Sequence, residues 1–418
     1  MKHIFSKYYS LFSNSKFVLL LNISDRLYSF IIMLILAREF ASETYGEIVT
    51  LFTFAMIMQM LFDLGLPALV QKEIAAEEFS AGSHLFSGCF IFALLLLPFY
   101  ILLSYIFKLI LYPGTDITLF FVVFLFMYEA SLINICNKAL SGKNDFKSQF
   151  ISCIISRAYI LLMFVLGLYF LRFSLSSLML VILTGFFLNF LLIFRALNKN
   201  GIELSFKEFS FKEIKTILKV AIPLGLAVIF NFMYDKIDII LLSKLKDFDH
   251  VAYYNIGYGI YKSATIGFSF LLVAGYTQVS LISKNKEAVK NFFSDHVKVI
   301  ITICLIIGIM LFVLSDMVIS ILYTERYSDA SVVVKILALG FIGLGLNNLT
   351  GITLNGMGYF KVVMYITLYG LILNIILNVF FIPIYGIKAA SFISVVTEYF
   401  IFFVQYYYLR KILKPEGN

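Results

Sequence analysis

Long apolar stretches recur along the whole chain, and short polar segments that hold most of the charged residues separate them. Each stretch covers about 20 residues or more, which is the length that an α-helix needs to cross a hydrocarbon layer of about 30 Å. Strands of a membrane barrel would alternate over about ten residues, whereas these stretches are continuous. The pattern therefore predicts an all-α protein with about twelve membrane-spanning helices. Their approximate positions are 17–37, 45–70, 84–107, 117–138, 148–171, 173–194, 220–243, 250–276, 298–323, 331–355, 362–383 and 387–409.

The composition supports a membrane protein. Of the 418 residues, 61% are hydrophobic and 14% are charged, against about 45–50% and about 25% in soluble domains. The first stretch is long, carries Asp25 and Arg26 and lacks a small-residue cleavage pattern, so we do not expect a removed signal peptide. The four cysteines fall inside predicted helices without C-x-x-C spacing, which favours lone buried thiols over disulfides or metal ligands.

The basic residues lie unevenly on the two sides of the predicted helices. If the amino terminus is cytoplasmic, 21 of the 33 Lys and Arg residues fall on that side and 8 on the other, which predicts that both termini are cytoplasmic. The longest polar segment, 195–219, carries six basic and three acidic residues midway along the chain. It separates an amino-terminal lobe at 1–197 and a carboxyl-terminal lobe at 220–418, with 198–219 as a cytoplasmic linker. Each lobe has an even number of helices, so the lobes form parallel repeats.

Six segments, in this order along the chain, carry a family resemblance. They are "YGEIVTLFTF", "FDLGLPALVQKEIA", "YDKIDIILLSKL", "ILYTERYSDA", "LNGMGYFK" and "IPIYGIKAASFISVVTEY". Together they resemble the polysaccharide transporter (Wzx-type) branch of the multidrug/oligosaccharidyl-lipid/polysaccharide (MOP) exporter superfamily, over nearly the whole chain. The resemblance implies a V-shaped transporter with a central cleft between the lobes, lined by helices 1, 2, 7 and 8.

The resemblance also implies a function. Such a protein would be a flippase that moves an undecaprenyl-diphosphate-linked oligosaccharide repeat unit from the cytoplasmic to the periplasmic leaflet of the bacterial inner membrane. It would work by ion-coupled alternating access and serve the synthesis of O-antigen, capsule or exopolysaccharide. Expected partners are this lipid-linked oligosaccharide, membrane lipids and other polysaccharide assembly proteins, and no nucleic acid.

Charged residues inside membrane helices are costly and usually face a cavity or a partner. Arg26 lies near the middle of the first helix and shares a face with Asn22, while Lys262 belongs to a tyrosine-rich stripe in the eighth helix. A diphosphate needs cations, and the flat faces of tyrosines suit sugar rings. In the architecture of the resembled family, Arg26 and Lys262 would face the same cleft from opposite lobes. The predicted substrate-binding residues are Asn22, Arg26, Lys236, Tyr254, Tyr258, Tyr261 and Lys262.

Two alternatives remain open for these cations. They can form ion pairs with aspartates on neighbouring helices, namely Asp25, Asp235 or Asp238, or they can reach toward the membrane surface. Arg157, in the fifth helix, is a weaker candidate because that helix need not face the cleft.

A second group of polar residues falls in the carboxyl-terminal lobe. Its members come from helices 7, 11 and 12 and offer only oxygen and amide groups, which suits a hard cation such as sodium, or a proton, and not a transition metal. The alternative is polar packing, because Asn and Ser often hydrogen-bond between membrane helices. The predicted coupling-ion residues are Asp235, Asp238, Asn374, Asn378, Ser394 and Glu398, with Asp235, Asn374, Asn378 and Ser394 as the candidate sodium ligands. No other cofactor is expected.

Asp63 stands just before Gly65 and Pro67 at the end of the second helix. Counted from Tyr45 it lies about 27 Å down the helix at about 1.5 Å per residue, near the cytoplasmic mouth. It is either an acid at a helix end beside a breaker or a gate residue that closes the inner mouth.

Other classes of protein fit the sequence less well. The chain has no G-x-x-x-x-G-K-[ST] loop, which argues against a nucleotide-driven pump. A membrane oligosaccharide polymerase would place catalytic residues on a large outer loop, and the expected outer loops are short, so we do not expect an enzyme. A drug exporter or a peptidoglycan lipid-precursor exporter of the same superfamily is the main alternative.

Overall fold

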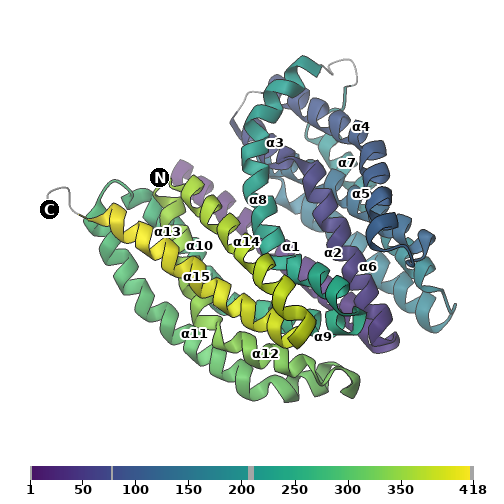
Figure 1. Ribbon diagram of the computed structural model, residues 1–418. Coiled ribbons are helices and arrows are strands. Elements are labelled where there is room, and N and C mark those ends of the chain that lie inside the picture. Colours follow the sequence, from purple (N-terminus) through teal and green to yellow (C-terminus); the bar gives the residue numbers. More distant parts are fainter. Residues whose placement is uncertain (1, 77–78, 206–210, 415–418) are drawn as a thin grey trace. The chain divides into compact units, whose positions relative to one another are not determined.

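A computed structural model describes residues 2–76, 79–205 and 211–414, without the side chains at 2–15, 79–83, 211–213, 220, 223–224, 227 and 270. All regular secondary structure in these residues is helical (Figure 1). The helices are α1 (Lys2–Glu39), α2 (Ser42–Asp63), α3 (Leu66–Ala76), α4 (Phe79–Leu111), α5 (Ile117–Gly142), α6 (Phe146–Tyr169), α7 (Leu175–Lys199), α8 (Phe211–Leu245), α9 (Phe248–Ala264), α10 (Ile266–Ile282), α11 (Lys286–Leu322), the short η2 (Glu325–Tyr327), α12 (Ala330–Leu339), α13 (Phe341–Gly356), α14 (Phe360–Tyr385) and α15 (Ile387–Leu413).

The predicted all-α, multi-pass membrane architecture is confirmed. Within the described residues, nine helices are long and apolar enough to cross a membrane, and the count rises to eleven if two bent helix pairs each form one span. The bent pairs are α9 with α10, and α12 with α13, the latter bent by 54°. Eleven of the twelve predicted segments correspond to these candidates. The remaining segment, 220–243, lies in α8, which includes undescribed side chains and is not in the count.

The chain divides into two compact units. The amino-terminal unit contains residues 1–35 and 54–229, and the carboxyl-terminal unit contains residues 36–53 and 230–418. Helices α1, α2 and α8 therefore each contribute residues to both units. The lobe boundaries at 197 and 220 stay a prediction, and residues 206–210 of the expected linker lie outside the described residues.

Short polar side chains cap the amino-terminal ends of several helices. The side chain of Asp116 accepts a hydrogen bond from the backbone N–H of Leu119 at 2.7 Å before α5. Asp247 does the same for His250 at 2.9 Å before α9. These caps satisfy backbone donors that have no partner inside the first turn, so they fix where the helix begins. Asp247 thereby sets the start of α9, the helix that carries the tyrosine stripe.

In the amino-terminal unit, the segment "FDLGLP" breaks one helix into α2 and α3. Leu64 and Gly65 have left-handed backbone conformations, with φ of 52° and 78°. A Cβ on Gly65 would lie 2.5 Å from the carbonyl oxygen of Ala221 on α8, so only glycine fits this close approach. Asp63, the last residue of α2, accepts hydrogen bonds from the backbone of Gly65 and from the Asn134 side chain. Its role as a gate stays a prediction.

Apolar side chains from α3, α4, α5 and α7 form the core of the amino-terminal unit. Leu66, Val70, Phe86 and Ile193 are fully buried there. Cys89 and Cys136 belong to the same cluster, and all four cysteines are buried and free of disulfides, as the sequence predicted.

The end of α1 and the start of α2 belong to the carboxyl-terminal unit. The hydroxyl of Tyr327 donates a hydrogen bond to the carbonyl oxygen of Ala37 at 2.9 Å. A Cβ on Gly46 would lie 1.8 Å from the carbonyl oxygen of Phe248, so the first turns of α2 and α9 are in close backbone contact. This packing holds α9 against α2 at the end where Asp247 begins it.

A buried polar site in the carboxyl-terminal unit

Four helices of the carboxyl-terminal unit supply most of the buried polar side chains. On α8, Asp235 and Asp238 lie three residues apart, so they point in neighbouring directions about 4.5 Å apart along the axis. On α9, Tyr254, Tyr258 and Lys262 follow each other at intervals of four and therefore share one face. Helices α14 and α15 supply asparagines, serines and Glu398. These side chains form two separate groups, one around each aspartate.

The first group is the Asp238 network, which consists of Asp238, Tyr254, Asn374, Asn378 and Ser394. The carboxylate of Asp238 accepts hydrogen bonds from the Tyr254 hydroxyl at 2.6 Å, the Asn378 amide at 2.7 Å and the Ser394 hydroxyl at 2.8 Å. The same Asn378 amide nitrogen also donates to Asn374 Oδ1 at 2.9 Å. Asp238 is 2% exposed, so its carboxylate is almost completely removed from water, and the groups that donate hydrogen bonds to it are all neutral.

One oxygen in the Asp238 network lacks a hydrogen-bond partner. Asn378 Oδ1 is buried and accepts no hydrogen bond among the described residues. A buried acceptor without a partner is unusual and calls for an explanation such as an ion. Together with the oxygens of Asp238, Asn374 and Ser394 it makes a donor set of the kind that hard cations prefer.

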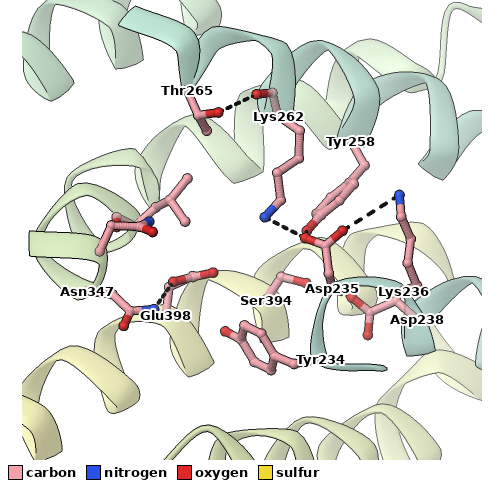
Figure 2. Close-up of polar contacts among 12 residues, drawn as sticks. Tyr234, Asp235, Lys236, Asp238, Tyr258, Lys262, Thr265, Asn347, Ser394 and Glu398 are labelled. Atoms are coloured by element: carbon pink, nitrogen blue, oxygen red, sulfur yellow. Dashed lines mark hydrogen bonds and ion pairs between the residues drawn. The ribbon is translucent and has the colours of Figure 1, made fainter. Parts of the chain in front are cut away.

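The second group surrounds Asp235 (Figure 2). Its carboxylate pairs with Lys262 Nζ at 2.5 Å and with Lys236 Nζ at 3.8 Å, and it accepts a hydrogen bond from the Tyr258 hydroxyl at 2.7 Å. The two ammonium groups lie 5.4 Å and 5.3 Å from the centre of the Tyr258 ring, which adds a cation–π contribution. At the end of α9, Thr265 Oγ1 donates to the carbonyl oxygen of Lys262 at 2.7 Å.

A cavity of about 220 Å³ opens beside the Asp235 group. Glu398, which is 7% exposed, lines it and accepts a hydrogen bond from the Asn347 amide at 2.7 Å (Figure 2). Gln405 also lines the cavity, and its buried Oε1 has no hydrogen-bond partner among the described residues. Further polar lining comes from the side chains of Asn231, Tyr234, Asn348, Asn355 and Thr367. We call this cavity the amide pocket.

The structure pairs the predicted coupling residues differently from the sequence-based grouping. The sequence grouped Asp235 with Asn378 and Ser394, because these residues lie at similar depths when counted from their helix ends, and with Asn374, which shares a helix face with Asn378. In the structure Asn378 and Ser394 bond to Asp238 instead. Asp235 is held by two lysines beside the amide pocket, and Glu398 also lines that pocket. What each residue does remains a prediction.

The predicted substrate-binding tyrosines are buried, and two of them bond to aspartates. Tyr254 donates to Asp238 and Tyr258 donates to Asp235. Tyr261 is 3% exposed and its ring packs edge-on against Phe341 at 5.5 Å. In this structure the tyrosine stripe therefore anchors the two acids and the core of the unit.

The amino-terminal unit contains the other predicted cations. Arg26 is exposed on α1, and Asn22, also exposed, donates to the carbonyl oxygen of Val18 in its own helix at 2.8 Å. Arg157, the weaker candidate by sequence, forms an ion pair with Asp25 in which two of its nitrogens lie 3.2 Å from Asp25 Oδ1.

Aromatic rings enclose the Arg157 guanidinium. The rings of Tyr28 and Phe186 have their centres 4.6 Å from it. Cys153 Sγ also donates to Asp25 Oδ1 at 3.2 Å. Arg157 thus sits at the centre of a packed polar cluster, whereas Arg26 projects from its helix.

Sequence reasoning missed the amide pocket. Asn231, Asn347, Asn348, Asn355 and Gln405 were not singled out, although each stands in an apolar helix where an amide is costly. The amides of "NNLTGITLN" were the available signal. No group of three or more His, Cys, Asp or Glu side chains gathers in the described part of the chain.

Comparisons with known proteins agree with this architecture. The chain is 26% identical over 424 residues to an uncharacterized membrane protein of Methanocaldococcus jannaschii, MJ1375, covering 97% of this chain and 99% of that protein. The fold of the present chain is similar to that of the lipid II flippase MurJ in an inward closed conformation. The TM-score is 0.77 at 17% identity, and the match covers 94% of this chain and 87% of that chain.

A multidrug resistance MATE family transporter of the MOP superfamily, in an inward-facing conformation, gives a TM-score of 0.74 at 13% identity and 94% coverage of both chains. At these identities the two structures establish the fold alone. The family model described as "Polysaccharide biosynthesis protein" matches residues 11–276, and the MatE model matches residues 223–380. The first match covers more than half of the chain, so this protein belongs to the family of multi-pass membrane proteins described as polysaccharide biosynthesis proteins.

Proposed function

We propose that this protein is a flippase that moves an oligosaccharide linked to undecaprenyl diphosphate from the cytoplasmic to the outer leaflet by ion-coupled alternating access. The observation that carries the proposal is the amide pocket beside the Asp235–Lys262 pair. A purely apolar drug would gain little binding free energy from a lining of amides and charged groups. A headgroup that combines a diphosphate with sugar hydroxyls can use both its cations and its amides.

The diphosphate contact rests on the two lysines that Asp235 holds. A diphosphate carries more negative charge than one carboxylate, so it competes with Asp235 for Lys262 and Lys236. The amides of Asn231, Asn348 and Asn355 then serve sugar hydroxyls as donors and acceptors. The pocket is smaller than the usual ligand site of about 300–1,000 Å³, so it suits one part of the headgroup. Arg26 is proposed as a further diphosphate ligand.

The coupling ion is proposed to act at the Asp238 network. Asp238, Asn374, Asn378 and Ser394 would hold sodium through their oxygens, or Asp238 would take up a proton. A bound cation neutralises the carboxylate and so favours the conformation in which these helices are drawn together. Asp238 takes the place that the sequence grouping gave to Asp235, because only Asp238 bonds to Asn378 and Ser394.

We further propose the bacterial inner membrane as the location, with both termini cytoplasmic. The support is the distribution of 21 against 8 basic residues on the two sides of the predicted helices. Cysteine labelling of intact cells should leave both termini unlabelled by an impermeant reagent. Labelling of either terminus would contradict this orientation.

The test is transport in sealed vesicles. The purified protein is reconstituted with a fluorescent undecaprenyl-diphosphate oligosaccharide, and its arrival in the opposite leaflet is followed with and without imposed sodium and proton gradients. We expect transport that depends on one of the two gradients. Lys262→Ala and Arg26→Ala should both abolish it, while Lys335→Ala, which breaks the exposed Asp316–Lys335 pair at 2.7 Å, should leave it unchanged.

Two results would contradict the proposal. The first is efflux of cationic drugs from the same vesicles together with no movement of the lipid-linked oligosaccharide, which would indicate the multidrug alternative. The second is movement of the lipid precursor of peptidoglycan in preference to any oligosaccharide carrier, which would indicate the lipid-precursor alternative.

A further inference from the structure

A groove of about 780 Å³ lies on the carboxyl-terminal unit, between the first turns of α11 and the last turns of α15. The two helices are in contact, and both are long and apolar enough to span a membrane (Figure 1). We call it the α11–α15 groove. Its residues are not part of the polar site, since none of them lines the amide pocket.

Four cations line this groove at one end of the two helices. Lys290 and Lys298 come from the start of α11, and Arg410 and Lys414 come from the end of α15. All four side chains are exposed, and none forms an ion pair with another residue in the described part of the chain. No acidic residue lines the groove. The groove therefore presents uncompensated positive charge.

Apolar and aromatic side chains line the groove among and beyond these cations. Phe293 and Tyr406 stack across it with ring centres 5.9 Å apart and planes inclined by 24°. Ile301 lines its α11 side about 16 Å along the helix from Lys290, at about 1.5 Å per residue. Phe402 lines the α15 side two turns before Arg410. Lys298 lies about 12 Å along α11 from Lys290, past Phe293. A ligand that fills the groove thus meets cations along this length and apolar side chains both among and beyond them.

This division of charge and apolar surface decides the kind of ligand. A soluble anion would use the cations and leave the aromatic part empty, and a neutral lipid would leave the four charges unmatched. An anionic phospholipid uses both, because its phosphate lies at the membrane surface and its acyl chains lie in the hydrocarbon. We propose that the α11–α15 groove binds an anionic phospholipid of the surrounding bilayer, with its headgroup held by Lys290, Lys298, Arg410 and Lys414.

The site fits the proposed orientation, although it does not depend on transport. With the carboxyl terminus cytoplasmic, the four cations lie at the leaflet that carries most anionic lipid in cells. Helix α15 also carries Ser394 and Glu398 of the polar site. A lipid that holds the end of α15 against α11 should therefore stabilise the unit in which that site lies.

The test measures lipid binding by the whole protein. Purified protein in a neutral detergent is titrated with phosphatidylglycerol or phosphatidylcholine. Native mass spectrometry counts the bound lipid molecules, and thermal unfolding of the same samples gives the midpoint temperature. We expect at least a tenfold preference for phosphatidylglycerol, and a rise of the midpoint with that lipid alone. Lys298→Gln combined with Arg410→Gln should remove the preference. The matched control, Lys284→Gln combined with Lys361→Gln, changes two exposed lysines outside the groove and should keep it.

A second variant tests the apolar part separately. Ser294 is an exposed, small residue in the lining, so Ser294→Trp fills the groove while all four cations stay in place. It should also lose the preference, which a simple surface attraction for anions would retain.

Three results would overturn the proposal. They are equal binding of the two lipids by the unaltered protein, full competition by inorganic phosphate, and a preference that survives in both groove variants. Displacement of phosphatidylglycerol by polyprenyl diphosphate at lower concentration would also overturn it, since the groove would then hold the carrier lipid of the substrate.

Discussion

The two units bury charge in different ways. In the amino-terminal unit Arg157 and Asp25 form a one-to-one pair, and the guanidinium is enclosed by the rings of Tyr28 and Phe186. In the carboxyl-terminal unit Asp235 is shared by two lysines, and Asp238 is held only by neutral hydrogen-bond donors. The amino-terminal unit therefore contains an acid paired with one cation, whereas the carboxyl-terminal unit contains Asp238, which has no counter-charge in contact among the described residues.

This difference separates structural charge from charge that can change its partner. The Arg157 guanidinium is 13% exposed and is fixed by packing between two rings, while Asp25 is 47% exposed and keeps access to water when the pair is broken. A carboxylate held by neutral groups can bind a cation or a proton without breaking an existing ion pair. Lys262 lies beside a cavity, so its pairing with Asp235 can be replaced by a ligand. We therefore expect substitutions of Asp238 and Asp235 to affect transport, and substitution of Arg157 to affect stability.

The largest effect is expected from Asp238→Asn. The change keeps the size and removes the charge, so stimulation of transport by an ion gradient should fall by at least about tenfold, a free-energy change of about 1.4 kcal/mol. Substrate binding should survive. Asp235→Asn serves as the comparison and should weaken binding while the dependence on the gradient remains. Flux in vesicles measures both, and the reverse ranking of the two variants would return the ion site to Asp235.

The next effect is expected from Arg157→Ala. Loss of the guanidinium opens a space between the rings of Tyr28 and Phe186, so the free energy of unfolding should fall by about 0.5–3 kcal/mol. Asp25 is 47% exposed and contributes little to this loss. Arg157→Lys should recover only part of this, since lysine lacks the planar group that stacks on both rings. Thermal unfolding in detergent measures the loss. A variant that unfolds like the unaltered protein but no longer transports would show that Arg157 belongs to the transport site after all.

The coupling energy between Asp235 and Lys262 is expected to be smaller than these effects. Both side chains are partly exposed, at 28% and 35%, and Lys236 remains near Asp235 when Lys262 is removed. A double-mutant cycle of Asp235→Ala and Lys262→Ala should give an interaction of about 0.5–3 kcal/mol, the range for residues in one ion-pair network. The exposed pair Asp316–Lys335 is the matched cycle and should give about 0–1 kcal/mol. Equal values for the two cycles would show that the surroundings of Asp235 do not strengthen its pairing with Lys262.

The smallest effect on stability is expected from Arg26→Ala. Arg26 is exposed, so its removal should change stability by about 0.5 kcal/mol or less, in contrast to Arg157 on a neighbouring helix of the same unit. If Arg26 binds the diphosphate, transport is lost while the thermal midpoint is retained. A large fall of the midpoint would assign Arg26 to the packing of its unit.

Much of the fold could be predicted from the sequence, because a membrane-spanning helix is recognised by the length of its apolar stretch. A stretch of about 20 apolar residues has few other stable structures in a bilayer, and eleven of the predicted segments coincide with candidate spans. The breaks inside them were less accessible. The bend between α12 and α13 falls within the single predicted segment 331–355, where no proline marks it.

The composition of the site was partly accessible for the same reason. A charge or amide in an apolar helix stands out, and Asp235, Asp238, Lys262 and Glu398 were found in this way. The contacts of Arg157 were not accessible from the sequence, because Tyr28 and Phe186 look there like ordinary apolar residues of membrane helices. The amide pocket was missed because its asparagines and its glutamine come from α8, α13 and α15 and have no common spacing.

The sequence by itself determined that this is a helical membrane protein with charges concentrated in a few helices, because hydrophobicity and helical period are properties of each segment alone. Only the tertiary structure decided which aspartate meets Asn378 and Ser394. Two residues three apart on a helix differ by about 60° in direction and about 4.5 Å in height. The rotation and depth of α8 against α14 and α15 select between them, and packing contacts distant in the sequence set that rotation.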